Sequence, residues 1–329
     1  MIVGDFPFAR PRRLRSSGWM REMCQEHFLK PSHLILPLFV REKEMDGDIP
    51  SMPQIKRFTV PELLPVVHEA LTLGIKSVAL FPVIAGDQRD AKGEGAFRED
   101  NLISRAIRAI KGSFPEIGVI ADVALDPYTS HGQDGLLIHG RVPNDETVEV
   151  LCAQALLQAR AGCDILAPSD MMDGRIMAIR KTLDDHGFDH VALMSYGAKY
   201  ASSFYGPFRD ALKTDGADKN LKKTYQMNPG NIKEALKEIA MDIREGADMV
   251  MVKPGLPYLD VISKAAQTFH VPIFAYQVSG EYAMLKAASN NGWLDFDSCL
   301  MESLLCFKRA GAQGIFTYAA LHGAKILNA

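Results

Sequence analysis

The sequence predicts an α/β protein with the (β/α)8 architecture, a TIM barrel, preceded by an extended N-terminal arm. Eight short runs of apolar and β-branched residues recur along the chain, each bounded by turn-forming residues. Within these runs hydrophobicity is continuous rather than alternating, which is typical of parallel strands covered on both faces. Eight strands that alternate with helices favour a closed barrel over an open doubly wound sheet, and no glycine-rich dinucleotide fingerprint follows the first strand.

The arm is predicted to comprise residues 1–33 and the catalytic barrel residues 34–329. The arm contains PRRLR (11–15) and has no apolar pattern of its own that would form a core. A segment rich in arginine and proline would therefore pack on a neighbouring subunit. The alternative interpretation is a disordered tail.

The predicted strands follow the arm in order and are all four to eight residues long, the length expected of buried strands. They are LILPLFV (34–40), SVALFPV (77–83), GVIADVAL (118–125), DILAPS (164–169), HVALMSY (190–196), DMVMVKP (248–254), PIFAYQV (272–278) and GIFTYA (314–319).

The segments between the strands carry apolar residues at helical spacing, most clearly over residues 63–71, 148–159 and 232–243. The joints between a predicted helix and the next strand also recur, each with a glycine where helices commonly end. This weak internal repeat is seen in RAGCD (160–164), REGAD (244–248) and RAGAQG (309–314).

The composition limits the classes of function. The chain has 329 residues, 47% of them hydrophobic, and can therefore bury a large core. Its net charge of −3 predicts neither a nucleic-acid nor a membrane partner. No apolar run reaches the roughly 18 residues of a membrane span. The cysteines are odd in number and lack metal-ligand spacing, which predicts a reducing, cytoplasmic location without a cysteine zinc site: Cys24, Cys152, Cys163, Cys299 and Cys306.

Two lysines stand out at predicted strand ends. Lys253 lies at the end of the run DMVMVKPG (248–255), and Lys199 lies just past the strand 190–196. Chemistry in such barrels takes place at the C-terminal ends of the strands, so both lysines should reach the same mouth. A partly desolvated lysine beside a second cation has a lowered pKa and can attack a carbonyl to form a Schiff base. Alternatively, Lys253 extends to solvent and Lys199 is an ordinary loop residue.

The surrounding residues indicate acidic substrates. Arg209, Lys222 and Lys223 lie in the long polar segment 200–228, which is typical of a mobile lid. Ser279 and Tyr318 end their predicted strands and could donate hydrogen bonds to a carboxylate. A solvated loop is the alternative interpretation of the three cations.

Six longer motifs contain or neighbour these residues. They are DVALDPYTSHGQDG (122–135), APSDMMDGR (167–175), SYGAKYASSFYGPFRDA (195–211), YQMNPGN (225–231), EGADMVMVKPG (245–255) and YQVSGEYAM (276–284). With these motifs, which are long and occur in family order, the sequence closely resembles the porphobilinogen synthase family, also called 5-aminolevulinate dehydratase. The resemblance covers nearly the whole chain from PRRLR onward.

The resemblance implies the condensation of two 5-aminolevulinate molecules into porphobilinogen, with loss of two waters, in tetrapyrrole (heme) biosynthesis. It implies that Lys253 forms the Schiff base of the first, propionate-side substrate and Lys199 that of the acetate-side substrate. The other residues that it assigns to substrate binding are Ser279 and Tyr318 at the propionate-side carboxylate, Tyr276 in that pocket, Arg209, Lys222 and Gln226 at the other carboxylate, Phe208 and Tyr205 in the lid, and Ser169.

One motif departs from the zinc-dependent members of the family, because their three cysteines are replaced here by Ala124, Asp126 and Asp134. Two carboxylates do not make a closed zinc site and prefer Mg²⁺ or K⁺, so no zinc is expected. The pattern resembles the aspartate-rich, magnesium-responsive members, in which an allosteric Mg²⁺ is held through waters by the counterpart of Glu238. Asp173 would lie near it. Glu238 could equally be a plain surface glutamate, and some relatives use no metal.

Asp122, Asp126 and Asp134 are expected to gather at the end of the strand 118–125. They could orient an amino group, hold K⁺ or another monovalent cation, or transfer protons. Asp126, which precedes Pro127, could also simply begin a turn.

The resemblance further implies a homo-octamer built from dimers that embrace through their arms, with Mg²⁺ shifting the population of assemblies. Two other classes of function remain open. A single-lysine Schiff-base barrel of the aldolase type would need one essential lysine and a phosphate site, and a catalytically silent paralogue would keep the barrel and the arm alone.

Overall fold

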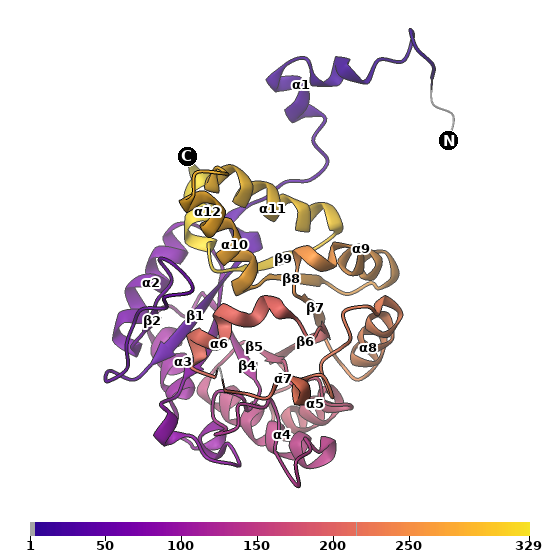
Figure 1. Ribbon diagram of the computed structural model, residues 1–329. Coiled ribbons are helices and arrows are strands. Elements are labelled where there is room, and N and C mark those ends of the chain that lie inside the picture. The colour runs from indigo at the N-terminus through magenta and orange to yellow at the C-terminus, as the bar shows by residue number, and fades with distance from the viewer. Residues whose placement is uncertain (1–3, 215) are drawn as a thin grey trace.

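The protein is a closed barrel of parallel strands surrounded by helices, with an arm that leaves it at the N-terminus (Figure 1). The computed structural model describes residues 4–214 and 216–329. Each barrel strand pairs in parallel with its neighbours, and β9 returns to pair with β1, so the sheet has closed on itself. This confirms the predicted TIM barrel.

All eight predicted strands are present, with small shifts at their ends. The barrel strands are β1 (Leu34–Arg41), β3 (Ser77–Val83), β4 (Gly118–Val123), β5 (Ile165–Pro168), β6 (Ala192–Lys199), β7 (Met249–Lys253), β8 (Ile273–Gln277) and β9 (Gly314–Thr317). A further strand, β2 (Arg57–Phe58), pairs with β1 outside the barrel. The sequence does not predict β2, because two residues carry no hydrophobic period.

The outer layer consists of nine long helices among the described residues. They are α2 (Val60–Thr72), α3 (Leu102–Ser113), α4 (Asn144–Ala161), α5 (Arg175–Asp185), α8 (Ile232–Arg244), α9 (Leu259–Thr268), α10 (Ser279–Asn290), α11 (Phe296–Ala310) and α12 (Ala320–Asn328). The shorter ones are α1 (Gly18–Met23), α6 (Gly206–Leu212), α7 (Lys219–Lys222), and the 3-10 turns η1 (Pro11–Arg15), η2 (Pro31–His33), η3 (Gly86–Gln88), η4 (Glu94–Phe97), η5 (Ser203–Tyr205) and η6 (Leu256–Tyr258).

The predicted glycine joints are confirmed. Gly162, Gly246 and Gly311 follow α4, α8 and α11 with φ of 99°, 110° and 107°. Only glycine adopts this left-handed conformation without strain, so it ends each helix and turns the chain into the next strand. No helix in the described part of the chain is long and apolar enough to cross a membrane.

The arm buries little of its own surface. It runs from Gly4 to His33 through η1, α1 and η2 and projects away from the barrel (Figure 1). Large apolar side chains on it face solvent in the single chain, including Phe6, Phe8 and Trp19, which are 76%, 84% and 63% exposed. An arm of this composition would gain stability by packing on another surface, and its docking on a second subunit stays a prediction.

Candidate active site

The two predicted lysines are neighbours in the sheet. Lys199 is the last residue of β6, Lys253 is the last residue of β7, and the two are paired in the strand register. The prediction that Lys199 lies beyond its strand is wrong, because β6 continues through Gly197. A Cβ at Gly197 would come within 3.0 Å of the Ile239 side chain, so the glycine lets the strand pass close to α8.

Lys253 is buried among aromatic rings. Its Nζ lies 4.6 Å from the ring centre of Tyr276, 5.0 Å from Phe208, 5.1 Å from Tyr196 and 5.5 Å from Tyr205. Burial first, and then the nearby charge of Lys199, lower the pKa of Lys253 to about 7. Near neutral pH, Lys253 is therefore a free amine in a large fraction of the protein molecules. The free amine is the nucleophilic form of the side chain.

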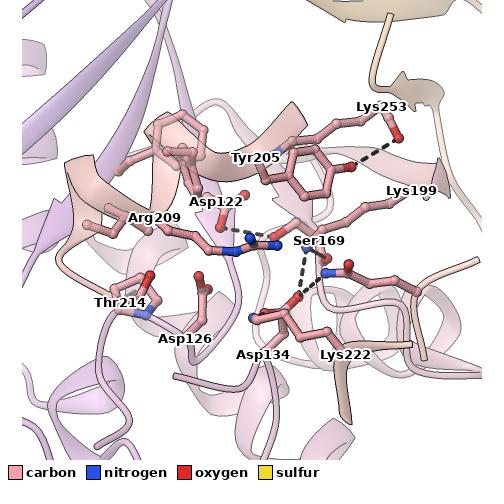
Figure 2. Close-up of a pocket in the computed structure, with 15 residues that line it drawn as sticks. Asp122, Asp126, Asp134, Ser169, Lys199, Tyr205, Arg209, Thr214, Lys222 and Lys253 are labelled. Carbon is pink, nitrogen blue, oxygen red and sulfur yellow. Dashed lines mark hydrogen bonds and ion pairs between the residues drawn. The ribbon is translucent and has the colours of Figure 1, made fainter. Parts of the chain in front are cut away.

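Lys199 has the opposite environment. Its Nζ donates to Asp134 Oδ2 at 2.8 Å and to the Ser169 carbonyl (Figure 2). Burial alone would lower the pKa of Lys199, but the charges of Asp134 and Asp126 outweigh it and raise that pKa above its usual value. The prediction that both lysines have lowered pKa values is thus wrong for Lys199, because the sequence did not reveal which lysine contacts a carboxylate.

Asp134 holds two ammonium groups at once. Its Oδ1 accepts from Lys222 Nζ at 2.5 Å, and Gln226 donates to its Oδ2 at 3.3 Å beside Lys199. Burial would raise the pKa of Asp134, but the charges of Lys199 and Lys222 outweigh it and hold the pKa well below its usual range. Asp134 is therefore ionised, and both of its oxygens are occupied by the protein.

The other two carboxylates have pKa values raised above the usual range. Asp122, in β4, and Asp126, three residues after β4, both line the small cavity beside the lysines. Burial raises the pKa of Asp122 to about 7, and burial together with the charge of Asp134 raises that of Asp126. Asp122 accepts a hydrogen bond from the Ser169 hydroxyl at 3.1 Å. The site thus places proton donors and acceptors next to an amine nucleophile.

The described parts of the segment 200–228, residues 200–214 and 216–228, cover the mouth of the barrel, with α6 and α7 lying across it (Figure 1). Arg209 points from this lid into the pocket (Figure 2), and Lys222 is buried there, whereas Lys223 is exposed. The cavity beneath is about 30 Å³, enough for a water molecule or two. A cavity of this size does not hold a substrate molecule, which is consistent with the prediction that the lid is mobile.

The structure does not bring every predicted binding residue to this cavity. Ser279 is the first residue of α10 rather than the end of a strand, and its hydroxyl accepts from the Phe208 backbone N–H at 2.9 Å. Tyr318 follows β9, and its hydroxyl contacts that of Tyr276 at 3.1 Å. Ser279 and Tyr318 do not line this cavity, whereas Phe208 of the lid does, with its ring centre 5.0 Å from Lys253 Nζ. The residues that do line the cavity with the lysines are Asp122, Asp126, Asp134, Ser169, Tyr205, Phe208, Arg209, Lys222 and Gln226.

Two arginines that the sequence analysis missed hold the lid down. Arg57 donates to the carbonyls of Asp210 and Ala211 at 2.8 and 2.7 Å, and Arg89 donates to those of Leu212 and Lys213 at 2.6 and 3.0 Å. The last carbonyls of a helix lack the usual partners of its interior, and the guanidinium groups supply side-chain donors here; Asp210 O also accepts from the Lys213 backbone N–H at 3.1 Å. Sequence gave no signal for this contact, because the arginines lie more than 100 residues before the lid.

We expect Arg89→Ala to loosen the lid. Two charge-assisted hydrogen bonds would be lost, each worth about 1.5–3 kcal/mol, and KM should rise on the order of tenfold because Phe208 and Arg209 are held less well. Limited proteolysis within residues 200–228 should accelerate in parallel. Lysine keeps the positive charge of Arg89 but not its two parallel N–H donors. The KM and the rate of proteolysis of Arg89→Lys should therefore lie between those of wild type and Arg89→Ala. If KM and the rate of proteolysis are both unchanged in Arg89→Ala, Arg89 does not hold the lid in place.

The predicted metal neighbourhood lies away from the lysines, on α8. Glu238 is half-buried, and burial followed by the charge of Asp242 raises its pKa; the charges of Arg175 and Asp173 also act on it. Asp173 itself is exposed. Within residues 4–214 and 216–329, no group of three or more His, Cys, Asp or Glu side chains is arranged to hold a metal ion. A single carboxylate of this kind fits a hydrated hard cation better than a closed zinc site.

The fold and this pocket together define a TIM-barrel enzyme whose catalytic end carries two adjacent buried lysines. The sequence model of the delta-aminolevulinic acid dehydratase (ALAD) family matches residues 8–326. The delta-aminolevulinic acid dehydratase of Bradyrhizobium diazoefficiens is 55% identical over 97% of this chain and 90% of its own length. That of Rhodobacter capsulatus is 47% identical over 100% and 99%.

A solved structure shows the same arrangement of the chain. The delta-aminolevulinic acid dehydratase (porphobilinogen synthase) of Toxoplasma gondii ME49, in complex with the reaction product porphobilinogen, is 49% identical with a TM-score of 0.94. The match covers 97% of this chain and 91% of that one. This chain belongs to the delta-aminolevulinic acid dehydratase family and is an enzyme of that family, which confirms the activity predicted from its motifs.

Proposed function

We propose that the chain condenses two molecules of 5-aminolevulinate through one Schiff base on Lys253 and a second on Lys199. The observation that carries this proposal is the pairing of the two lysines in register at the ends of β6 and β7. Their unequal environments suit a product assembled from two identical substrates in different roles. The porphobilinogen bound to the Toxoplasma gondii relative supports the same product here.

Lys253 would react first, because its lowered pKa leaves it partly unprotonated. Its nitrogen attacks the ketone carbon of one substrate and forms a carbon–nitrogen bond, while the carbonyl oxygen takes a proton. The resulting carbinolamine loses that oxygen as water and becomes an imine. Asp122, whose pKa is about 7, can supply the proton at this stage.

Lys199 must lose a proton before it can attack the second substrate. Its ammonium group is held by Asp134, so an incoming substrate that separates the pair would remove the charge that keeps the proton in place. The carbon next to the Lys199 imine loses a proton and, as an enamine, attacks the Lys253 imine carbon, so a carbon–carbon bond joins the two skeletons. Lys253 then leaves as an amine, with loss of a second proton from the attacking carbon. The amino group of the first substrate attacks the Lys199 imine carbon, which closes the ring and expels Lys199 as an amine, and loss of a proton from a ring carbon gives the pyrrole. Overall, two 5-aminolevulinate molecules give porphobilinogen and two waters.

The substrate carboxylates would be bound at two places. Arg209, Lys222 and Gln226 surround the Lys199 side of the cavity and would take one of them. Ser279 and Tyr318 would take the other once Phe208 has swung away with the lid. Tyr276 then remains as a wall of the pocket beside Lys253.

The direct experiment is to incubate the purified protein with 5-aminolevulinate and assay the pyrrole product. We expect porphobilinogen to form, with loss of activity when either lysine is replaced. Activity that needs only one lysine would favour the single-lysine aldolase type. A folded protein that makes no pyrrole would favour a silent paralogue.

We also propose the aspartate-rich, magnesium-responsive subtype, without zinc, assembled as a homo-octamer of dimers in the cytoplasm. Support comes from Ala124, Asp126 and Asp134, which offer no thiolate, and from the exposed apolar side chains of the arm. Glu238 would hold Mg²⁺ through waters, with Asp173 nearby, and the ion would favour the larger assembly. A monovalent cation such as K⁺ near Asp126 is compatible with the same carboxylates.

The magnesium proposal predicts a shift in assembly. Adding Mg²⁺ should move the size-exclusion profile toward the octamer and raise activity, and Glu238→Gln should abolish both responses because a neutral amide binds the hydrated ion weakly. Glu234→Gln, one turn earlier on α8, is the matched control and should keep both. Identical profiles with and without Mg²⁺ while activity changes would contradict the assembly mechanism.

A further inference from the structure

Glu281, in the first turn of α10, is a fully buried carboxylate that the chemistry above does not use. Its oxygens accept three backbone N–H groups, from Leu256 at 2.7 Å, from Val278 at 2.7 Å and from Gly255 at 3.2 Å. Burial raises the pKa of Glu281 to about 7 against the opposing effect of these three bonds. A carboxylate placed so deeply is costly, which raises the question of what it holds together.

The three donors come from two segments of the chain, one after β7 and one at the start of α10. Gly255 and Leu256 follow Lys253 by two and three residues. Val278 directly precedes Ser279. One side chain therefore ties the backbone behind the nucleophilic lysine to the backbone that presents the serine.

Part of this arrangement is ordinary helix capping, and part is not. The bond from the Val278 N–H to the glutamate at the third helical position is a common way to begin a helix. The bonds from Gly255 and Leu256 belong to a different strand-end loop and serve no cap of α10. They make Glu281 a link between β7 and α10.

The backbone on both sides of this link is tightly packed against its neighbours. A Cβ at Gly255 would lie 2.4 Å from the Phe307 ring and 2.9 Å from the Tyr276 carbonyl. A Cβ at Gly280 would lie 2.4 Å from the Phe204 carbonyl, at the start of the lid. The loop after Lys253, the first turn of α10 and the lid entrance are thus packed directly around Glu281.

We propose that Glu281 is a positioning residue that sets Lys253 and Ser279 at the correct separation for one substrate molecule. This inference rests on the proposed Schiff base at Lys253. Glu281 does not line the cavity and transfers no proton to substrate. It acts through the backbone next to the two residues that would contact the ketone and the carboxylate of the same molecule.

The substitution Glu281→Gln tests this role with little change in volume. The glutamine oxygen can take the place of one carboxylate oxygen, but its NH₂ group then faces a backbone N–H that needs an acceptor. Either the Lys253 loop or the start of α10 must shift. A displacement of about 1 Å at a reacting group costs on the order of 100-fold in rate.

The experiment compares wild type, Glu281→Gln and Glu62→Gln, incubated with 5-aminolevulinate and borohydride, with adducts at each lysine followed over time by mass spectrometry. Glu62 is the matched control, because it occupies the same position in the capping box of α2, remote from the lysines. In Glu281→Gln we expect the rate of Lys253 labelling and kcat/KM each to fall about 100-fold. KM should rise because Ser279 is displaced. The rate of Lys199 labelling should stay within a few-fold of wild type. Glu62→Gln should match wild type.

Wild-type labelling of Lys253 with an unchanged KM in Glu281→Gln would overturn the inference, whatever the stability of the variant. An equal loss at both lysines would do the same, because it would indicate general damage to the fold. If Glu281→Gln does not fold, Glu281→Asp is the alternative, because aspartate keeps the carboxylate acceptor on a side chain that is one methylene shorter. This variant should show the same loss of labelling at Lys253 but not at Lys199. A wild-type protein that labels at neither lysine would overturn the proposed function, and this inference with it.

Discussion

Replacing Lys253 with methionine should abolish the condensation and at the same time make the protein more stable. Removing a covalent nucleophile typically lowers kcat on the order of 10⁴-fold or more. The stability gain follows from the buried amine, whose pKa falls from 10.5 to about 7 on folding and whose presence therefore lowers the free energy of unfolding at neutral pH by on the order of 4 kcal/mol. Methionine has a similar length and no charge to desolvate.

The sign of the effect can be checked against pH. Between about pH 7 and pH 10 the unfolded chain binds a proton at Lys253 that the folded chain does not, so the wild-type contribution to stability rises with pH in that window. Thermal melting should show a higher Tm for Lys253→Met near pH 7 and a smaller difference near pH 10. Lys199→Met should instead lose stability, because it leaves Asp134 with one ammonium partner fewer. A Lys253→Met protein less stable than wild type at both pH values would contradict the account of its environment.

The second large effect is expected for Asp134→Asn. Two buried ammonium groups, Lys199 and Lys222, would lose the carboxylate that compensates both of them. Breaking a buried ion pair on one side costs about 3–5 kcal/mol. The pKa of Lys199 should fall at the same time, because the charge of Asp134 is the main factor that raises it. The variant should therefore be less stable, with Lys199 closer to the free amine form.

A double substitution separates charge from packing. If uncompensated charge causes the loss, adding Lys222→Met to Asp134→Asn should restore part of the stability measured by thermal melting. Asp164→Asn is a control, because its pair with Lys111 is partly exposed and should matter less. The wild-type stabilisation by Asp134 is present above about pH 4 and is lost as pH falls toward its depressed pKa. An Asp134→Asn melting curve equal to wild type at neutral pH would refute this role.

The sequence was sufficient for the barrel because its signals are local. Eight buried strands show continuous apolar runs, and Gly162, Gly246 and Gly311 end helices in a conformation that only glycine adopts easily. Strand ends were less predictable. The end of β6 was missed because Gly197 interrupts the apolar run, although its missing side chain is what allows the strand to continue past α8.

Residue types in the site could be predicted, but not their partners. Lys199 and Lys253 look alike in sequence, yet one contacts Asp134 and the other contacts aromatic rings, so their pKa values move in opposite directions. Arg89 and Glu281 gave no signal at all. The contacts that matter here are with backbone groups of distant segments, and a backbone group looks the same whatever the sequence.

Both lysines are proposed to form covalent imines with substrate. Trapping of these imines with borohydride tests that proposal most directly. The protein is incubated with 5-aminolevulinate from about pH 5 to about pH 9, reduced, digested and analysed by mass spectrometry for adducts at each lysine. We predict adducts at Lys199 and at Lys253, with the Lys253 adduct forming faster as pH rises to about 7 and then levelling off. Adducts confined to a single lysine at every pH, while porphobilinogen is still produced, would contradict the two-imine account.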